Sequence, residues 1–170
     1  MEIKAQLNKP CTDEERADFI VEQNHQKGYI IEETDEVIEA WGQTAEELLA
    51  DRKAAKQAEN TEKAKLAVEN GHVVFKNAEF ETNAQTVGDL TATMLLMQAG
   101  GVESYLWLSK DDQTVALTVE DFGTLGGLIA TYKNTIWQEK YITYKTQIEQ
   151  AQTVDAVNAI DLDYSDEVAE

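Results

Sequence analysis

Residues 118–151 read TVEDFGTLGGLIATYKNTIWQEKYITYKTQIEQA. Thr118, followed three positions later by Asp121, is typical of a capping box, because the hydroxyl and the carboxylate can each bind an unpaired amide where a helix begins. Apolar side chains then recur every three or four residues, which places them on one helix face: Phe122, Leu125, Ile129, Tyr132 and Ile136. The pattern predicts one long helix over residues 118–151, and we expect the chain from His72 onward to cover one side of it.

The second half of this helix is rich in aromatic residues. Trp137, Tyr141, Tyr144 and Ile148 continue the spacing one position later, so the apolar stripe drifts around the helix axis. Aromatic residues at helical spacing favour a place in the core, and a carbohydrate-binding platform that includes Trp107 is the alternative. The candidates for contacts with a partner are these residues: Trp107, Trp137, Tyr141, Tyr144, Phe19 and Trp41.

Two adjacent glycines, Gly126 and Gly127, lie inside the predicted helix. Each costs about 1 kcal/mol of helix stability relative to alanine, so a compensating role is expected. Close approach of a neighbouring strand or helix is the favoured explanation. A kink or a notch for a docking partner is the alternative.

Composition limits the classes of partner. The chain has 170 residues with 42% hydrophobic content, enough to bury a core in one domain or in one domain and a smaller appendage. The net charge is −19, and acidic residues outnumber basic ones in both halves. Because nucleic acids and anionic membranes are negatively charged, we expect neither to be a partner.

Cysteine usage and hydropathy limit the cellular compartments in which the protein can be expected. Cys11 is the single cysteine, which excludes an internal disulfide framework and any site built from several thiolates. No apolar run reaches the length of a signal peptide or the ~20 residues of a membrane span. We therefore expect the protein to be synthesised in a cytoplasm.

The sequence pattern of residues 1–43 predicts a small attachment unit with the element order β-α-β-α. Residues 3–7 alternate as a strand, a capping box at Thr12 begins a helix that ends at Gly28, and residues 29–31 form a second strand. Thr34 is then expected to cap a short helix that carries Val37, Ile38 and Trp41. A unit of this size rarely holds a fold unaided.

Residues 44–71 predict a connecting helix, which begins with Thr44 and Glu47 as a capping box. Its large apolar residues occur only near its ends, so a solvent-exposed helix is favoured. A weak coiled coil is the alternative, although the stretch lacks apolar residues at every a and d position.

Residues 72–161 predict a C-terminal α+β domain. Residues 73–75 and 78–81 are expected to form a hairpin or two short strands ahead of a helix capped by Thr86, and a hairpin at 105–118 leads into the long helix. A short helix follows Thr153, and residues 162–170 are expected to be a frayed acidic tail. The overall prediction is an α+β protein with a small N-terminal unit, a helical linker and short antiparallel strands packed on a long helix.

No catalytic, cofactor-binding or metal-binding residues are predicted. His25 and His72 lie in different units without a second ligand at metal-binding spacing. Asp161, Asp163 and Ser165 have the spacing that opens a calcium loop, but the glycine and the final glutamate of such a loop are missing. A solvated acidic segment is the favoured interpretation, and we expect no enzyme activity and no cofactor.

Two stretches resemble families of tailed bacteriophages. Residues 1–48 resemble an N-terminal module of phage and prophage proteins. Residues 73–160 are similar to a domain of uncharacterised function at the C-terminal end of many phage tail and tail-fibre-associated proteins. The matching features are Val74-Phe75 with Phe80, the Trp107 strand, DQTVALT at 112–118 leading into Asp121-Phe122, and IEQAQT at 148–153 running to Val157 and Ile160-Asp161.

The resemblance implies a function without catalytic residues. It implies a structural protein of the virion, in the tail-fibre or baseplate region, that contacts other tail or fibre proteins. The alternative is an assembly chaperone that binds the fibre during maturation. Homo-oligomerisation stays open at this point.

Overall fold

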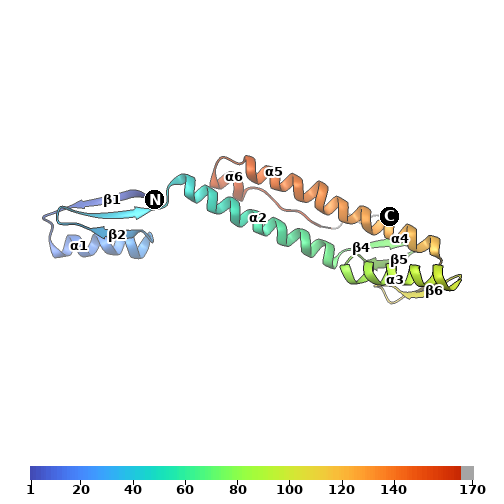
Figure 1. The fold of residues 1–170 in the computed structure, drawn as a ribbon. Helices are drawn as coiled ribbons and strands as arrows, with labels where there is room; N and C mark the ends of the chain where they lie inside the picture. The colour runs from blue at the N-terminus through green and yellow to red at the C-terminus, as the bar shows by residue number, and fades with distance from the viewer. Residues whose placement is uncertain (166–170) are drawn as a thin grey trace. The chain divides into compact units, whose positions relative to one another are not determined.

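The structure, a computed structural model, describes residues 1–165 and contains two compact units (Figure 1). Unit 1 comprises Met1–Ala54 with Gln152–Val154, and unit 2 comprises Ala55–Ala151 with the residues from Asp155 onward. Helices and short antiparallel strands make up both units, which confirms the α+β class. Among residues 1–165, no helix combines the length and the apolar character needed to cross a lipid bilayer.

Unit 1 is built on a three-stranded antiparallel sheet in the order β1-β3-β2. Ile38 and Ala40 of the central strand have no exposed surface and form its core. Ahead of the long helix α2 (Ala45–Asn70), the elements of this unit are β1 (Glu2–Asn8), α1 (Asp13–Ile20), the π-helical η1 (Val21–Gln26), β2 (Ile30–Glu33) and β3 (Val37–Gly42).

The short helix predicted after Thr34 is wrong, because residues 37–42 form the central strand β3. The Thr34 hydroxyl accepts hydrogen bonds from the amides of Glu36 (3.3 Å) and Val37 (3.2 Å). A helix cap makes bonds of the same kind, but here they close the turn between β2 and β3. The observed order is therefore β-α-β-β.

The capping box at Thr12 is confirmed, with the Glu15 amide donating to the Thr12 hydroxyl at 3.2 Å. Phe19 and Ile20 are half-buried, whereas Ala17 and Val21 are exposed.

The ion pairs that Glu33 makes with Arg16 and Lys9 should make the stability of unit 1 depend on pH. Hydrogen bonds from the Arg16 guanidinium, the shortest 2.7 Å, and from Lys9 Nζ at 2.7 Å lower the pKa of Glu33 from 4.5 to about 2. Because the pKa is depressed in the folded state, the stabilisation is complete above pH 4.5 and disappears as the pH falls toward 2. The stability gap between the wild type and Glu33→Gln should narrow over this range in thermal unfolding of unit 1. A gap that stays constant would contradict this assignment.

Unit 2 contains two antiparallel hairpins and a long helical segment (Figure 1). The predicted strand pairs are confirmed, and the first turn has positive φ at Lys76 and Asn77, as tight hairpin turns require. Its elements are β4 (His72–Phe75), β5 (Ala78–Glu81), α3 (Ala84–Gly100), β6 (Tyr105–Leu108), β7 (Thr114–Leu117), α4 (Val119–Asn134), η2 (Thr135–Tyr141), α5 (Ile142–Gln150) and α6 (Val154–Asn158).

The helix predicted over residues 118–151 is confirmed as the continuous series α4, η2 and α5, with the capping box in place at Thr118. The π-helical segment η2 explains the drift of the apolar stripe. A π-helical turn holds an extra residue, so the side chains after Ile136 point inward one position later than an α-helix would allow. Leu125, Ile129, Tyr132 and Ile136 are buried along this series.

The helix α2 (Ala45–Asn70) has the predicted bounds, but the expectation of a solvent-exposed linker is wrong for one of its faces. Lys56, Asn60 and Ala64 are buried on it. Asn60 Nδ2 donates to the carbonyl of Tyr141 at 3.3 Å, so α2 packs against η2 within unit 2 (Figure 1).

The frayed tail predicted from residue 162 is wrong for residues 162–165, and the rest of that prediction lies outside the described residues. Leu162 and Tyr164 are buried in the core of unit 2. The Tyr164 hydroxyl donates to Asn60 Oδ1 at 2.7 Å, and the Tyr144 hydroxyl donates to the carbonyl of Asp163 at 2.9 Å. This short segment therefore joins α2 to α5.

Candidate functional site

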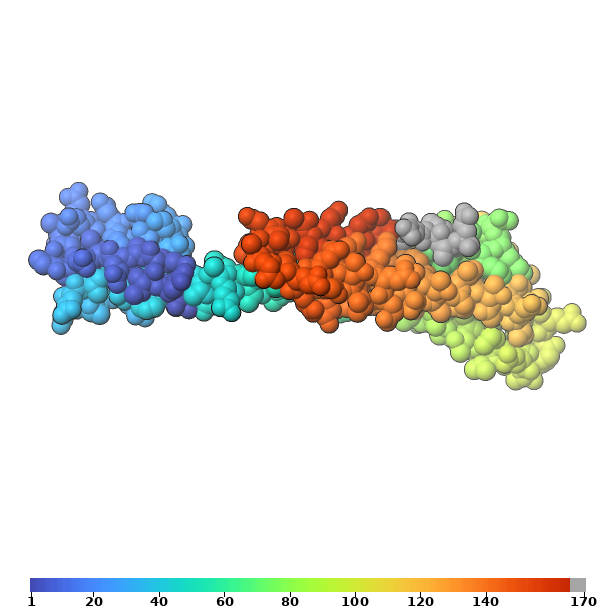
Figure 2. Space-filling model, turned by 90° about the horizontal axis from the view of Figure 1, so that it is seen from above, coloured from blue at the N-terminus to red at the C-terminus, as the bar shows by residue number. Residues whose placement is uncertain are grey.

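Large apolar side chains are exposed at the C-terminal end of α3, in the turn after it and along β6. Four consecutive apolar residues, 94–97, occur in α3, and a helix cannot turn all of them inward. Met97 is 2% exposed and packs in the core, whereas Leu96 is 64% exposed. In Figure 2 this yellow-green part of the chain projects from the edge of unit 2. The exposed apolar residues here are Leu95, Leu96, Val102, Tyr105, Leu106 and Leu108.

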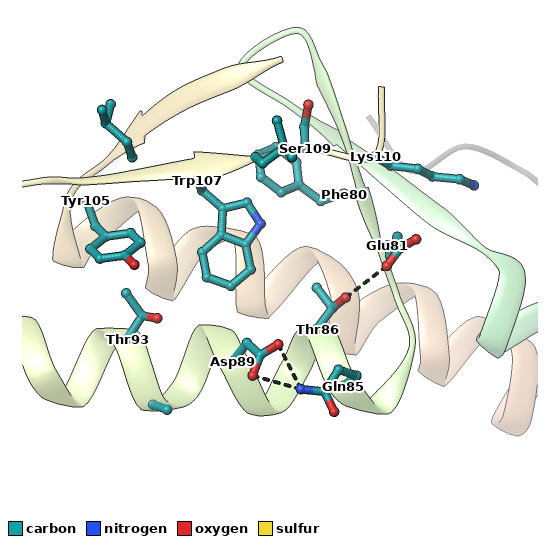
Figure 3. A pocket seen from close by; sticks show the side chains of 13 residues that line it. Phe80, Glu81, Gln85, Thr86, Asp89, Thr93, Tyr105, Trp107, Ser109 and Lys110 are labelled. Atoms are coloured by element: carbon teal, nitrogen blue, oxygen red, sulfur yellow. Dashed lines mark hydrogen bonds between the residues drawn. The ribbon is translucent and has the colours of Figure 1, made fainter. Parts of the chain in front are cut away.

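A groove of about 730 Å³ lies between α3 and β6, and we call it the α3–β6 groove (Figure 3). Trp107 projects from β6 toward α3 in this groove, and its ring packs edge-on against Phe122 with the centroids 5.8 Å apart. The groove is lined by Phe80, Glu81, Gln85, Thr86, Asp89, Ala92, Thr93 and residues 105–110.

One edge of β6 is open. Ser109 N donates to Gln113 O at 2.9 Å, so by the alternation of an antiparallel pair the backbone groups of Tyr105 and Trp107 also face β7. The N–H and C=O groups of Leu106 and Leu108 face the other way. Among the described residues, no backbone hydrogen bond pairs those groups.

The β6–β7 hairpin is fixed to the β4–β5 hairpin by its turn. Lys110 N donates to Glu79 O at 2.8 Å, and Asp111 Oδ1 accepts from Glu79 N at 3.1 Å. The Ser109 hydroxyl donates to the same carboxylate at 2.6 Å, and this bond, followed by that from Glu79 N, lowers the pKa of Asp111. These bonds hold one end of β6 in place while its open edge faces the groove.

The charged groups of the groove are mainly acidic. Asp89 is the single charged residue of α3, and its carboxylate accepts from Gln85 Nε2 at 2.9 Å (Figure 3). Glu81 lies at the end of β5, where Thr86 Oγ1 donates to it at 3.3 Å. Lys110 is the one basic lining residue. The groove therefore presents one carboxylate on α3, that of Asp89, and a second, that of Glu81, at the end of β5.

A second, smaller groove of about 270 Å³ lies between α3 and α4 and is mostly apolar. Its floor includes Gly123 and Gly126 of α4. The close approach expected at Gly126 and Gly127 is wrong, because a Cβ at either position would meet no atom of the described residues within 4 Å. Gly123 and Gly126 leave a notch on the surface of α4 where this groove lies.

This notch gives a prediction for stability. Gly126→Ala and Gly127→Ala should each raise the free energy of unfolding by about 1 kcal/mol, because alanine favours the helix and has room here. Urea denaturation measures the change. In Gly71→Ala, the added methyl would collide with Tyr132 and the carbonyl of Ala67, so this control should lose stability. A loss at Gly126 or Gly127 would contradict the prediction.

The aromatic residues proposed for partner contacts lie in different places in the structure. Trp107 lines the α3–β6 groove. Trp137 and Tyr141 pack edge-on with ring centroids 5.2 Å apart, and Tyr144 packs on Tyr164 at 5.5 Å. Trp137, Tyr141 and Tyr144 pack against the buried core of unit 2, as the core interpretation predicts. The Tyr141 hydroxyl also accepts a hydrogen bond from Gln57 Nε2 of α2 at 3.1 Å.

The remaining two candidates lie in unit 1. Phe19 is half-buried at the end of α1, and Trp41 Nε1 donates to Glu39 Oε2 at 3.2 Å on β3. Their role in partner contacts stays a prediction. The exposed leucines of α3 and β6 were missed by the sequence analysis, although the apolar run at 94–97 was the signal that could have revealed them.

The possible calcium-loop opening at Asp161, Asp163 and Ser165 is part of the packed segment. Asp163 Oδ1 accepts hydrogen bonds from the Ser165 amide at 2.8 Å and from its hydroxyl at 2.5 Å. Within residues 1–165, no three His, Cys, Asp or Glu side chains gather in a metal-binding arrangement.

Comparison with known proteins identifies the family to which the chain belongs. Residues 44–165 match the family described as Domain of unknown function (DUF4376). The chain belongs to this family. No curated protein and no solved structure matches the chain.

The DUF4376 region begins at Thr44, immediately before α2, and ends with the packed segment at Ser165. It contains the whole α3–β6 groove and the notch on α4. The three-stranded sheet of unit 1 lies outside it. The candidate surface is therefore part of the DUF4376 fold itself.

Proposed function

We propose that this DUF4376 protein is a non-enzymatic structural component of a bacteriophage tail, in the fibre or baseplate region, which joins other tail proteins through the surface of α3 and β6. The resemblance of residues 73–160 to domains of phage tail proteins supports the setting. Tail and fibre proteins are the partners, and nucleic acid and membranes are not.

The observation that carries this proposal is the exposed apolar surface of α3 and β6. Large exposed apolar side chains that occur close together on a soluble protein often mark a site of protein–protein contact. Leu106 is 67% exposed and Leu108 is 63% exposed, beside an open strand edge. The high net negative charge suits such a surface, since like charge repels unsuitable partners and keeps the free protein soluble.

Quantitative mass spectrometry of purified virions tests the proposal. The protein should be present at a fixed copy number relative to a tail-fibre or baseplate protein. Its absence from mature particles would overturn the structural role. If it were found bound to fibre protein in infected-cell lysates but missing from particles, the fibre-assembly chaperone would be the correct assignment.

A further inference from the structure

The open edge of β6 has backbone groups that are unpaired among the described residues and can bind another strand, and the proposed function does not say what binds there. Natural proteins protect edge strands with charged residues, prolines or covering elements, because unpaired backbone groups bind other strands. Leu106 and Leu108, whose backbone groups face the open edge, are apolar, and their side chains are exposed. The edge is therefore available as a template for pairing.

Within residues 1–165, the chain pairs with this edge only at the Lys110 end of β6. Glu79 of β5 pairs with Lys110 through the N–H···O bond of 2.8 Å. Beyond Glu81 the chain turns away into α3, which begins after its cap at Asn83. The α3–β6 groove lies beside the rest of β6, and β6 residues on both sides of Trp107 line it (Figure 3). Four residues of an added strand span about 13 Å at ~3.3 Å per residue, which corresponds to the four residues of β6.

We infer that β6 binds an extended segment of a partner protein as an added strand in the α3–β6 groove, with a basic side chain of that segment beside Asp89. This inference rests on the proposed function, since it gives the binding mode and the chemistry of the partner. The backbone of the segment pairs with the N–H and C=O groups of Leu106 and Leu108.

The two faces of the added strand meet different surroundings. Side chains on the same face as Trp107 point toward α3, where Asp89 is the one charged residue. A lysine or arginine at such a position gains an ion pair. Side chains on the other face lie beside the exposed Leu106 and Leu108, so aliphatic residues suit them. The segment therefore alternates basic or polar residues with aliphatic ones.

A partner protein fits this edge better than a second copy of the chain. Two copies each carry a charge of −19, which opposes their association. Each copy would also bring its own α3 beside its own β6. A single extended segment enters the groove without that obstruction.

Selection from a random peptide library tests the inference without knowledge of the natural partner. The full chain is immobilised, peptides of about twelve residues are selected, and the bound peptides are sequenced. Alternating sequences with aliphatic residues and at least one lysine or arginine should be enriched. Enrichment of other sequences, or of none, would overturn the inference, as would preferential binding of oligosaccharide probes in the groove.

Amide hydrogen exchange then locates the bound peptide. The amides of Leu106 and Leu108 should become protected when a selected peptide binds the wild-type chain, whereas those of Thr114 and Ala116 on the outer edge of β7 should not change. Protection confined to β7 or to unit 1 would overturn the inference. This measurement needs no variant and therefore does not depend on a substitution being tolerated.

A matched pair of proline variants tests the edge directly. Leu106 and Ala116 lie opposite each other in the hairpin, and the N–H groups of both point away from the partner strand. Leu106→Pro should weaken binding of a selected peptide about tenfold or more, whereas Ala116→Pro should leave the affinity unchanged. Equal effects of the two variants would contradict β6 as the binding edge.

Charge reversal tests the chemistry of the partner. Asp89→Lys should weaken binding of a lysine-containing peptide about tenfold and strengthen binding of the same peptide with glutamate in place of lysine. An unchanged preference would remove Asp89 from the site. Because these assays use peptides and the purified chain, they can fail while the protein is found in virions, and they can succeed while it is absent from them.

Discussion

Replacing Leu162 and Tyr164 together by alanine should lower the free energy of unfolding of unit 2 by about 5 kcal/mol. Both side chains are buried, and the Tyr164 hydroxyl donates to Oδ1 of Asn60, which has no exposed surface. The double variant therefore leaves cavities and also removes a hydrogen-bond partner from a buried amide. Urea denaturation followed by far-UV circular dichroism measures the loss.

Asp161→Ala is the matched control in the same segment. Asp161 is exposed, so its replacement should change the stability by no more than about 0.5 kcal/mol. If the double variant unfolded at the same urea concentration as the wild type, the packing of this segment between α2 and α5 would be contradicted.

Leu125→Ala should cost about 2–5 kcal/mol, because Leu125 has no exposed surface and lies on the inner face of α4. The neighbouring core residues Phe122 and Ile129 are part of a continuous helix and cannot fully collapse into the space. The same urea titration, followed by far-UV circular dichroism, measures this loss.

Leu96→Ala removes the same side chain from a position that is 64% exposed. This control should change the stability by about 0.5 kcal/mol or less, since little apolar surface is lost from the core. Equal losses at Leu96 and Leu125 would mean that the inner face of α4 is not the core of unit 2.

The sequence predicted the parts of the fold that depend on local signals. The capping boxes at Thr12 and Thr118 begin helices as expected, and the strands on either side of Lys76-Asn77 form the expected hairpin. In each of these places a side chain or a turn acts on residues only a few positions away, so the pattern could be interpreted without knowledge of the rest of the chain.

The errors arose where distant residues determine the structure. Thr34 makes the same local hydrogen bonds in a strand turn as it would at a helix cap, and only pairing with β1 and β2 makes residues 37–42 a strand. Asn60 is polar, and only its bonds to Tyr141 and Tyr164 place it in the core. Local patterns could not reveal these partners.

The candidate site was the least predictable part. The strand of Leu106 and Leu108 was expected, and in the structure Trp107 of this strand packs on Phe122 of the long helix. Whether an edge of β6 is open depends on where β5 ends and α3 begins. The expected start of α3, capped by Thr86, was wrong, because Asn83 caps it instead, so the groove could not be derived from the pattern.

Photo-cross-linking in purified virions tests the central claim most directly, namely that this protein joins tail proteins through the open edge of β6. A photoreactive residue is placed at Leu106 or, as a control on α5, at the exposed Ile142. We expect position 106 to cross-link to an extended, lysine- or arginine-containing segment of one tail protein, and position 142 not to reach that segment. Cross-links from position 142 alone, or virions that hold the protein without any cross-link from position 106, would contradict the claim.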